Sequence, residues 1–456
     1  MKPPHIVLIH PWIEDFAAFD FWIRPLGLLR LATYLKWQGF KVTLIDCLER
    51  TSPDMKALIK TQKGKDSGDG RGNFYKLPLP KPAAVSFIPR RFSRYGISVE
   101  LFEQYLRDTE GPDLICLTSG MTYWYPALET VQRHIHDRWP HVPQVIGGIY
   151  ASLLPEHAAS KLAVKRVFPG LLSADFHQFL RELFPKFLIS STSSVDLMKF
   201  ILEPDYSLLT NREYVSIETS QGCPYRCSYC ATSIHSAHFV QFSPVDVLKL
   251  LNMLVNGCGT RDIAFYDDAL FYNPATHIKP ILQAVLKQNF RVRFHTPNGL
   301  FPRFIDLELA DLMVKTGFRT IRLSLDTMSA ERQKEMRKLE PSHLATAFHN
   351  LSAAGFPRKN IEVYLLVGLP GQKEEEVRAG LEFVAQLGGI TRLAQFSPVP
   401  GTLEWQKAIE LGIIKADSDP LLQNPSVYAF LNPTLTYEHF LQLKNLTAQL
   451  NHEIRG

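Results

Sequence analysis

Three cysteines within eight residues constrain this chain more than any other feature of its sequence. They lie in the segment Gly222-Cys223-Pro224-Tyr225-Arg226-Cys227-Ser228-Tyr229-Cys230, which has the spacing C-x3-C-x2-C. Three thiolates on one tight loop can bind three irons of a cubane cluster and leave the fourth iron without a protein ligand. The spacing therefore predicts a 4Fe–4S cluster with one iron open for chemistry.

Two other uses of these cysteines fit the sequence less well. A structural zinc site needs four ligands, and no second Cys or Cys/His pair of suitable spacing follows, although His235 and His238 could complete a Cys3His site. A disulfide within the triad would leave one cysteine over. The remaining cysteines are scattered singly beside apolar runs, so we expect them to be buried small side chains and not a second cluster site: Cys47, Cys116 and Cys258.

Size and charge narrow the possibilities. A chain of 456 residues can form two or three domains, and a net charge of +5 is too small to argue for nucleic acid. The segment His5–Ile9 is too short for the core of a signal peptide. No stretch approaches the length of a membrane-spanning helix. We expect a cytoplasmic protein without a membrane span and with nucleic acid an unlikely partner.

Residues 1–170 alternate between strand-like and helix-like segments. The apolar runs predict parallel strands, and the segment 25–38 has helical spacing that ends at Gly39. This order predicts a doubly wound parallel sheet of the flavodoxin or Rossmann type. The predicted strands are residues 6–9, 41–47, 114–118 and 144–146, and the predicted helices are residues 25–38, 99–108 and 126–138.

Two segments interrupt this alternation. Residues 50–96 are rich in Gly, Pro and Lys and read as an irregular insertion, with a flexible loop at 63–70. The basic, aromatic end of the insertion at 89–95 is read as a solvated arm, with a phosphate or RNA contact as the alternative. Residues 171–213 read as a connector with two amphipathic helical stretches.

Residues 214–411 repeat a strand–helix unit six times, which predicts a partial (β/α)6 barrel of the TIM type. In such barrels the chemistry lies at the carboxyl ends of the strands, and the cysteine loop follows the first one. Residues 412–456 should form a small helical cap. The expected strands are residues 215–219, 263–266, 291–294, 320–325, 362–367 and 391–396.

The cysteine motif at the start of a six-unit barrel resembles the radical S-adenosylmethionine (SAM) superfamily. The resemblance implies that Cys223, Cys227 and Cys230 bind the catalytic cluster. SAM would chelate the open iron, and its reductive cleavage would release a 5′-deoxyadenosyl radical. Tyr229 matches the aromatic position that lies against the adenine.

The same resemblance assigns SAM contacts to the ends of the later strands. Asp267 or Asp268 would accept hydrogen bonds from the SAM ammonium, although the family more often has Gly-Gly-Glu here. Arg337 and Lys338 follow strand four, where they could bind the SAM carboxylate. The other assigned contacts are Asn298 after strand three, Ser324 and Asp326 at the end of strand four, and Gly368 after strand five.

The N-terminal half is similar to the cobalamin-binding domain of one radical SAM subgroup. The turn Pro400-Gly401-Thr402 also resembles a turn of that subgroup. The loops after strands three and four carry small residues that would leave space for the nucleotide tail of cobalamin, although glycines there also occur in any flavodoxin-like fold. These residues are Ser119, Gly120, Gly147, Gly148 and Ser152.

The lower cobalt ligand departs from the methionine-synthase pattern. Cobalamin carriers of that type supply a histidine from Asp-x-His-x-x-Gly after strand one, and the loop 11–20 here contains no histidine. The triplet Asp175-Phe176-His177 copies three positions, but Leu180 replaces the glycine. Radical SAM relatives often bind cobalamin without a protein nitrogen ligand, so the cobalamin prediction stands beside that of a degenerate domain.

The resemblance implies a cobalamin-dependent radical SAM enzyme that transfers methyl to an unactivated carbon or a phosphinate phosphorus. Its partners would be a small-molecule or lipid substrate and an electron donor such as flavodoxin or ferredoxin. One alternative is non-methylating radical chemistry beside a degenerate cobalamin domain. Another is an RNA-modifying methylthiotransferase, whose extra cysteines and C-terminal barrel are missing from this sequence. A third is a corrinoid-binding regulatory module with a vestigial barrel.

Overall fold

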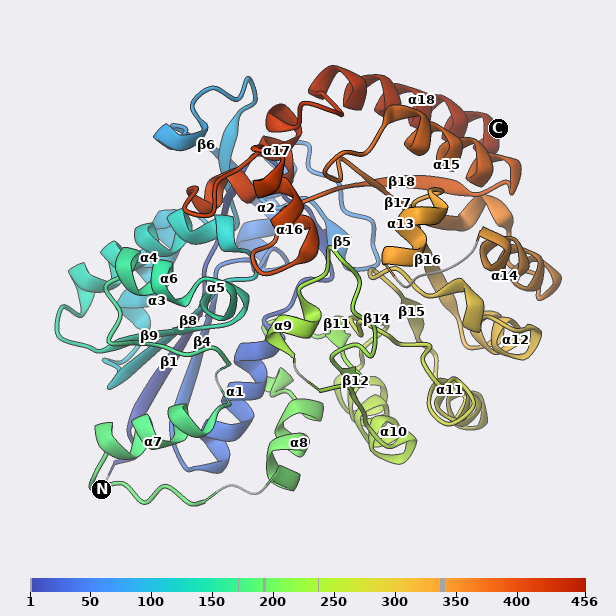
Figure 1. Cartoon of the computed structure of the whole chain (residues 1–456). Helices are drawn as coiled ribbons and strands as arrows, with labels where there is room; N and C mark the ends of the chain where they lie inside the picture. The colour runs from blue at the N-terminus through green and yellow to red at the C-terminus, as the bar shows by residue number, and fades with distance from the viewer. Residues whose placement is uncertain (1, 171, 192–193, 237, 337–340) are drawn as a thin grey trace. The chain divides into compact units, whose positions relative to one another are not determined.

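The computed structural model describes residues 2–170, 172–191, 194–236, 238–336 and 341–456. The chain divides into two compact units, residues 1–212 and residues 213–456. Figure 1 shows the helices and strands of both units along the chain. Each unit is built around a parallel sheet, as the sequence predicts.

The sheet of the first unit has the strand order β10-β9-β8-β1-β4. All four strand pairs are parallel. The chain starts at β1, adds β4 on one side and then continues on the other side, which is the flavodoxin-like order. The prediction of a doubly wound sheet is confirmed. The strands are β1 (His5–His10), β4 (Lys41–Asp46), β8 (Leu114–Thr118), β9 (Gln144–Gly147) and β10 (Arg166–Val167).

Helices cover both faces of this sheet (Figure 1). Helix α1 (Leu26–Trp37) buries the apolar residues that its sequence places at helical spacing, and Gly39 follows it with φ +91°. The helices α7 (Ala174–Leu183) and α8 (Ser194–Leu202), which the sequence suggests as a connector, contribute to the same core cluster as α1. The remaining helices are α3 (Val99–Asp108), α4 (Tyr125–Arg138), α5 (Ile149–Leu153) and α6 (Pro155–Lys161).

The insertion at 50–96 is more regular than its composition suggests. It contains the helix α2 (Pro53–Thr61), and its strands β6 (Lys76–Leu79) and β7 (Phe92–Tyr95) form an antiparallel sheet with β2 (Ile13–Asp15). The basic segment 89–95 is therefore largely the central strand of a small sheet and not a solvated arm. The short strands β3 (Asp20–Phe21) and β5 (Arg71–Gly72) form a second pair.

Long-range contacts also hold the segment 63–70, which the sequence predicts as a flexible loop. Buried Arg50 donates to Asp20 at 2.8 Å and to the carbonyl of Gly70 at 2.5 Å. The indole of Trp22 donates to the carbonyl of Asp69 at 2.5 Å. These partners lie up to 47 residues apart in sequence, so local composition could not predict the contacts.

The second unit contains a six-stranded parallel sheet in the order β11-β14-β15-β16-β17-β18. Every neighbouring pair is parallel and follows the sequence order, which confirms the predicted partial barrel. The strands are β11 (Tyr214–Ile217), β14 (Asp262–Phe265), β15 (Arg293–His295), β16 (Phe318–Asp326), β17 (Ile361–Val367) and β18 (Ile390–Gln395).

Helices lie on the outer side of these strands (Figure 1). They are α10 (Pro244–Asn252), α11 (Ile278–Lys287), α12 (Leu307–Lys315), α14 (Pro341–Ala353) and α15 (Glu374–Gln386). The shorter helices α13 (Ala330–Glu335) and α16 (Leu403–Glu410) follow the carboxyl ends of β16 and β18. Ser243 caps α10 and a proline occupies its first position. A π-helical turn, Met253–Gly257, leaves Cys258 half-exposed, so its predicted burial is wrong, whereas Cys47 and Cys116 are buried.

The C-terminal residues form α17 (Pro425–Leu431) and the long helix α18 (Tyr437–Arg455), which packs against α15 and β18. Asn451 of α18 bonds both backbone groups of Thr391 at 2.9 Å. The cap therefore belongs to the second unit. Within the described ranges, we find no helix with the length and apolar character needed to cross a membrane.

Candidate functional site

The cysteine loop is closed at its base by a short hairpin. Strand β12 (Ser220–Gln221) pairs antiparallel with β13 (Val240–Gln241), on the two sides of the three cysteines. Gly222 follows β12 with φ +74°, and a Cβ there would lie 2.5 Å from the carbonyl oxygen of His238. Only glycine fits this turn without displacing the backbone. The hairpin presents the loop after β11, at the carboxyl end of the first barrel strand.

The three cysteines of this loop are half-exposed thiols. Their chemistry suits iron, and the amide of Cys230 donates to the carbonyl of Cys227 at 3.0 Å, which makes the loop a tight turn. Across the described residues, no three His, Cys, Asp or Glu side chains are placed to bind one metal ion. A cubane does not require that arrangement, because each thiolate binds a different iron. The donor set therefore fits the predicted cluster.

Tyr229 and Asp326, both predicted SAM contacts, bond to one another. The Tyr229 hydroxyl donates to Asp326 Oδ2 at 3.0 Å, across 97 residues of sequence. Asp326 ends β16 in a left-handed conformation, with φ +63°, which costs free energy for a residue other than glycine. The pair joins the cysteine loop to the end of the fourth barrel strand.

Asp267 is a buried acceptor for the residues that enter the cysteine loop. Its Oδ1 accepts from the amide and hydroxyl of Thr219 at 2.9 and 2.8 Å and from the Ser220 hydroxyl at 2.6 Å. Its Oδ2 is buried without a hydrogen-bond partner among the described atoms. Burial raises the pKa of Asp267 to about 6, although these hydrogen bonds lower it. Asp267 thus ties the end of β14 to the end of β11.

Asp268 has a different environment from its neighbour. Its side chain is exposed to solvent but surrounded by protein on most sides, and this desolvation, with the charges of Glu218 and Asp267, raises its pKa to about 7. The Thr232 hydroxyl, a hydrogen-bond partner of Asp268, also lies 3.3 Å from Cys230 Sγ. Of the two carboxylates, Asp268 is therefore the one that a small cationic ligand can reach beside the cysteine loop.

The predicted contacts after strands three and four also lie near the strand ends. Asn298 donates to the carbonyls of Tyr266 and Asp267 at 2.8 and 3.3 Å, so its amide nitrogen braces the end of β14. Ser324 is buried, and a Cβ at Gly299 would lie 2.2 Å from its hydroxyl oxygen. Both side chains are thus in contact with neighbouring strand ends.

Gly368 follows β17 in a left-handed conformation, with φ +95°. Its amide donates to Gln372 Oε1 at 2.8 Å, and its carbonyl accepts from Asn432 at 2.9 Å. A Cβ at this position would meet no atom within 4 Å. The backbone here is held from both sides and faces open space, so a ligand could approach it closely.

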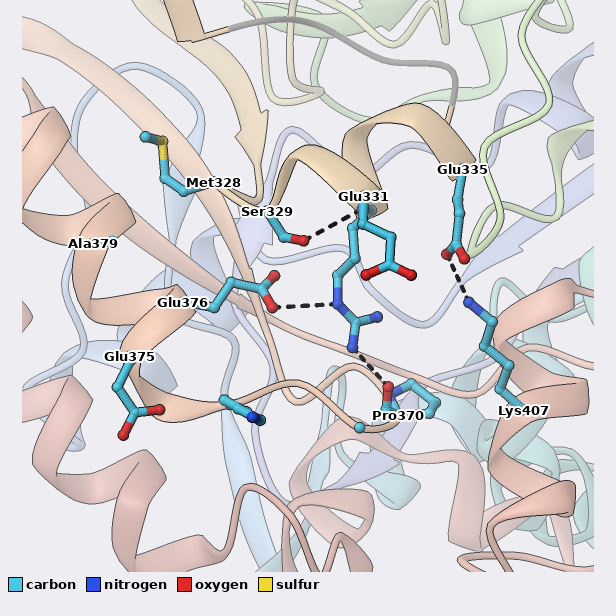
Figure 2. Close-up of a pocket in the computed structure, with 12 residues that line it drawn as sticks. Met328, Ser329, Glu331, Glu335, Pro370, Glu375, Glu376, Ala379 and Lys407 are labelled. Carbon is cyan, nitrogen blue, oxygen red and sulfur yellow. Dashed lines mark hydrogen bonds and ion pairs between the residues drawn. The ribbon is translucent and has the colours of Figure 1, made fainter.

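A polar pocket of about 500 Å³ lies beside the strand ends, between α13, α15 and α16 (Figure 2). Arg332 donates to Glu376 at 3.3 Å and to the carbonyl of Pro370 at 2.9 Å, and Lys407 bonds Glu335 at 2.7 Å. Among the described residues that line this pocket, none is a predicted SAM contact. Arg337 and Lys338, predicted to bind the SAM carboxylate, lie outside the described residues.

In the first unit, the predicted small residues lie at the end of β9, in the segments that follow β8 and β9, and in α5, where they pack closely against neighbouring atoms. Gly148 has φ +88°, and a Cβ there would lie 2.4 Å from the Thr118 hydroxyl. A Cβ at Gly120 would lie 3.3 Å from the Trp124 ring. The space that these glycines provide is therefore used by the protein itself.

The hydroxyls in these loops also have internal partners. Ser119 donates to the carbonyl of Met121 at 2.8 Å, and Ser152 donates to the carbonyl of Gly148 at 3.0 Å. Gly147 is buried at the end of β9. The side chains of Met121 and Ile149 are exposed beside these loops, which gives this edge an apolar surface.

The loop after β1 packs on the same edge of the sheet. Asp15 accepts from the indole of Trp124, which follows β8, at 2.8 Å. This loop lacks the histidine of the methionine-synthase pattern, as the sequence shows. The Asp175–His177 triplet lies in α7, where Phe176 is in the core and His177 bonds the Tyr34 hydroxyl at 2.7 Å. The triplet therefore has a packing role.

Several site residues were not found from the sequence. Thr219 and Ser220 bond Asp267, and Gln372 and Asn432 hold Gly368. The only local signal for the first pair is that it precedes the glycine of the cysteine loop. Asn432 lies 64 residues from its partner, so only the tertiary structure brings it to the site.

Part of the barrel matches a known protein family. Residues 217–384, from the first to the fifth strand–helix unit of the barrel, match the family described as the Radical SAM superfamily. An uncharacterized methyltransferase of Pyrococcus horikoshii is 23% identical over 365 residues, which cover 72% of this chain and 75% of the relative. The hopanoid C-3 methylase of Methylococcus capsulatus is 23% identical over 364 residues, 71% of this chain and 68% of the relative.

Two solved structures of TsrM, a radical SAM methyltransferase from Kitasatospora setae, have a similar fold. One, with cobalamin and a [4Fe-4S] cluster bound, has a TM-score of 0.64 at 16% identity and covers 98% of this chain and 91% of TsrM. The other, with tryptophan and a SAM analog bound, has a TM-score of 0.60 at 16% identity and covers 98% and 89%. The likeness establishes the fold, an N-terminal parallel sheet followed by the partial barrel.

Proposed function

We propose that this chain, a member of the radical SAM superfamily, is a cobalamin-dependent methyltransferase that acts on an unactivated carbon. The main observation in support of the proposal is the hydrogen bond from the Tyr229 hydroxyl to Asp326 Oδ2, at 3.0 Å. This bond brings the cysteine loop to the ends of the barrel strands. When bound, the cluster and SAM supply a 5′-deoxyadenosyl radical, and cobalamin carries the methyl group. The three cysteines would bind the cluster.

The barrel residues would bind and orient SAM. Asp268 is accessible and close to Thr232, so its carboxylate would accept the SAM ammonium beside the open iron. Asp267 is bonded to Thr219 and Ser220, so it would position the loop and not the ligand. The Tyr229–Asp326 pair would border the adenosine, and the backbone at Gly368 would allow close approach.

In the first unit, cobalamin would bind at the carboxyl edge of the parallel sheet. Ligands of doubly wound sheets bind beyond the carboxyl ends of the strands where the strand order reverses, here between β1 and β8. Exposed Met121 and Ile149 give this edge an apolar surface suited to a corrin ring. Ser119, Gly120, Gly147, Gly148 and Ser152 would act by shaping the loops, since their hydroxyls and Cβ positions are engaged within the protein.

Two of the similar proteins support a proposal for the class of substrate. TsrM binds tryptophan, and the Methylococcus capsulatus relative is named for methylating a hopanoid. We propose a small molecule or lipid as substrate and a flavodoxin or ferredoxin as electron donor. The internally packed glycines also support a second candidate, in which the first unit binds no corrinoid and the barrel performs non-methylating radical chemistry.

An absorption spectrum would separate these candidates. The chain would be reconstituted anaerobically with iron and sulfide, incubated with hydroxocobalamin and desalted. Retention of about one corrinoid per chain beside the iron–sulfur absorption would support the methyltransferase. Iron–sulfur absorption without corrinoid would support the second candidate. A chain that retains neither group would contradict both.

A further inference from the structure

A buried carboxylate contacts the cysteine loop from outside the motif. Glu404 is the second residue of α16 and is fully buried. The turn before it is fixed by Gly401, with φ +83°, and by the Thr402 hydroxyl, which accepts from the amide of Trp405 at 3.2 Å. Glu404 therefore has a defined position although it follows a loop.

Glu404 holds one residue of the loop at two points. The Ser228 hydroxyl donates to Glu404 Oε1 at 2.9 Å, and the Glu404 amide donates to the Ser228 carbonyl at 3.1 Å. Ser228 lies between Cys227 and Cys230 in the sequence and is itself buried. A reciprocal contact to this residue restrains the segment that sets the spacing of these two thiols.

The charge of Glu404 is poorly compensated. Its Oε2 is buried without a hydrogen-bond partner in the described part of the chain. Lys407 lies 3.5 Å from Oε1 but is closer to Glu335, at 2.7 Å. The buried hydroxyl of Tyr428, within electrostatic range of Glu404, also has no partner among the described residues. Burying a carboxylate with so few donors is costly, and a glutamine could accept the same bond from Ser228 at lower cost.

We propose that Glu404 is a positioning residue for the iron–sulfur cluster, which clamps Ser228 and places a fixed negative charge beside the cluster loop. The inference rests on the proposed function, because it requires the cluster. Reduction adds an electron to the cluster, and a nearby negative charge disfavours that step. The charge would lower the reduction potential, and the clamp would slow the loss of iron.

The test for the charge is Glu404→Gln, with Glu410→Gln as the matched control on the exposed side of the same helix. Both would be reconstituted with iron and sulfide and titrated by EPR-monitored reduction. We expect the midpoint potential of Glu404→Gln to shift to a more positive value, and that of Glu410→Gln to stay at the wild-type value. An unchanged or more negative potential in Glu404→Gln would overturn the proposed charge effect. A role in folding alone would not move the potential.

The test for the clamp is Ser228→Ala, which removes the hydroxyl donor and leaves the charge. We expect the cluster half-life in the presence of an iron chelator to fall about tenfold. A half-life equal to that of the wild type would overturn the clamp. If the wild-type chain itself takes up no cluster, the proposed function fails, and that result is distinct from either outcome in the variants.

Discussion

In each unit we propose a site at the carboxyl ends of the parallel strands, but these two sheet edges are built differently. At the barrel edge, reactive side chains from distant segments bond to one another, as Tyr229 does to Asp326 and Asp267 does to Thr219. At the edge of the first unit, small residues pack against each other, as Gly148 does against Thr118. The barrel edge is held by hydrogen bonds between side chains, and the edge of the first unit is held by close packing of the backbone.

This difference predicts how each edge responds to substitution. A barrel that depends on functional groups should lose activity when a single group is changed, with little effect on folding. A sheet edge that depends on close backbone approach should lose stability when atoms are added. Single substitutions at each edge test this contrast.

Replacing Cys227 with serine should abolish cluster binding and all SAM cleavage, because a hydroxyl is a poor ligand for iron. Retention of corrinoid should be unchanged, since the first unit forms its own core. Iron content, 5′-deoxyadenosine and corrinoid would be measured together. The control is Cys258→Ser, which changes a half-exposed thiol beside Met253. Loss of corrinoid together with iron in Cys227→Ser would break the contrast.

Replacing Gly148 with alanine should destabilise the first unit by about 3 kcal/mol, because of its positive φ and the clash with Thr118. Corrinoid retention should fall with it, whereas cluster content should stay the same. Thermal unfolding and the absorption spectrum measure both effects. Gly111→Ala is the matched control, since a Cβ there meets no atom within 4 Å. A Gly148→Ala protein as stable as the wild type would contradict the shape argument.

Replacing Tyr229 with phenylalanine should weaken SAM binding about fivefold, the value of roughly one hydrogen bond. The ring remains, and only the bond to Asp326 is lost. Calorimetry of the reconstituted protein with SAM measures the effect. The control is Tyr272→Phe, which also removes one tyrosine hydroxyl and leaves the ring packed against Phe239. Equal affinities in Tyr229→Phe and the wild type would remove this pair from the SAM site.

The pH dependence of SAM binding should depend on Asp268, whose pKa is raised to about 7. Below that pH the carboxyl is protonated and lacks the charge that attracts an ammonium group. SAM affinity should therefore rise about fivefold from pH 6 to pH 7. In Asp268→Asn this rise in affinity should vanish. In the control Asp311→Asn, at a half-exposed position of α12, the rise should remain. A rise that persists in Asp268→Asn would assign the titration to another group.

The contrast also explains what the sequence could predict. The cysteine spacing and the strand–helix alternation are local patterns, so they predicted the loop and both parallel sheets. The roles of Asp267 and Asp268 could not be separated, because adjacent residues at a strand end differ only in their tertiary neighbours. For the same reason, Glu404 could not be identified from the sequence, because its partner Ser228 lies 176 residues away.

The errors in the sequence analysis come from composition. The glycines and charges of 63–70 suggested a flexible loop, but a buried pair of Arg50 and Asp20 holds this segment. Cys258 follows an apolar run and was expected to be buried, but the π-helical turn before it shifts its direction. In the first case long-range contacts order an exposed segment, and in the second a change in the helix alters the exposure of one side chain.

An analysis of the products tests the proposed methyl transfer. The chain, reconstituted with iron, sulfide and cobalamin, would be incubated with SAM and a strong reductant under anaerobic conditions. The account predicts both S-adenosylhomocysteine, from methyl transfer, and 5′-deoxyadenosine, from radical cleavage. The former should disappear when cobalamin is omitted, and both should disappear in Cys227→Ser. Formation of 5′-deoxyadenosine alone, with cobalamin present, would contradict a methyltransferase and leave a radical SAM enzyme of another class.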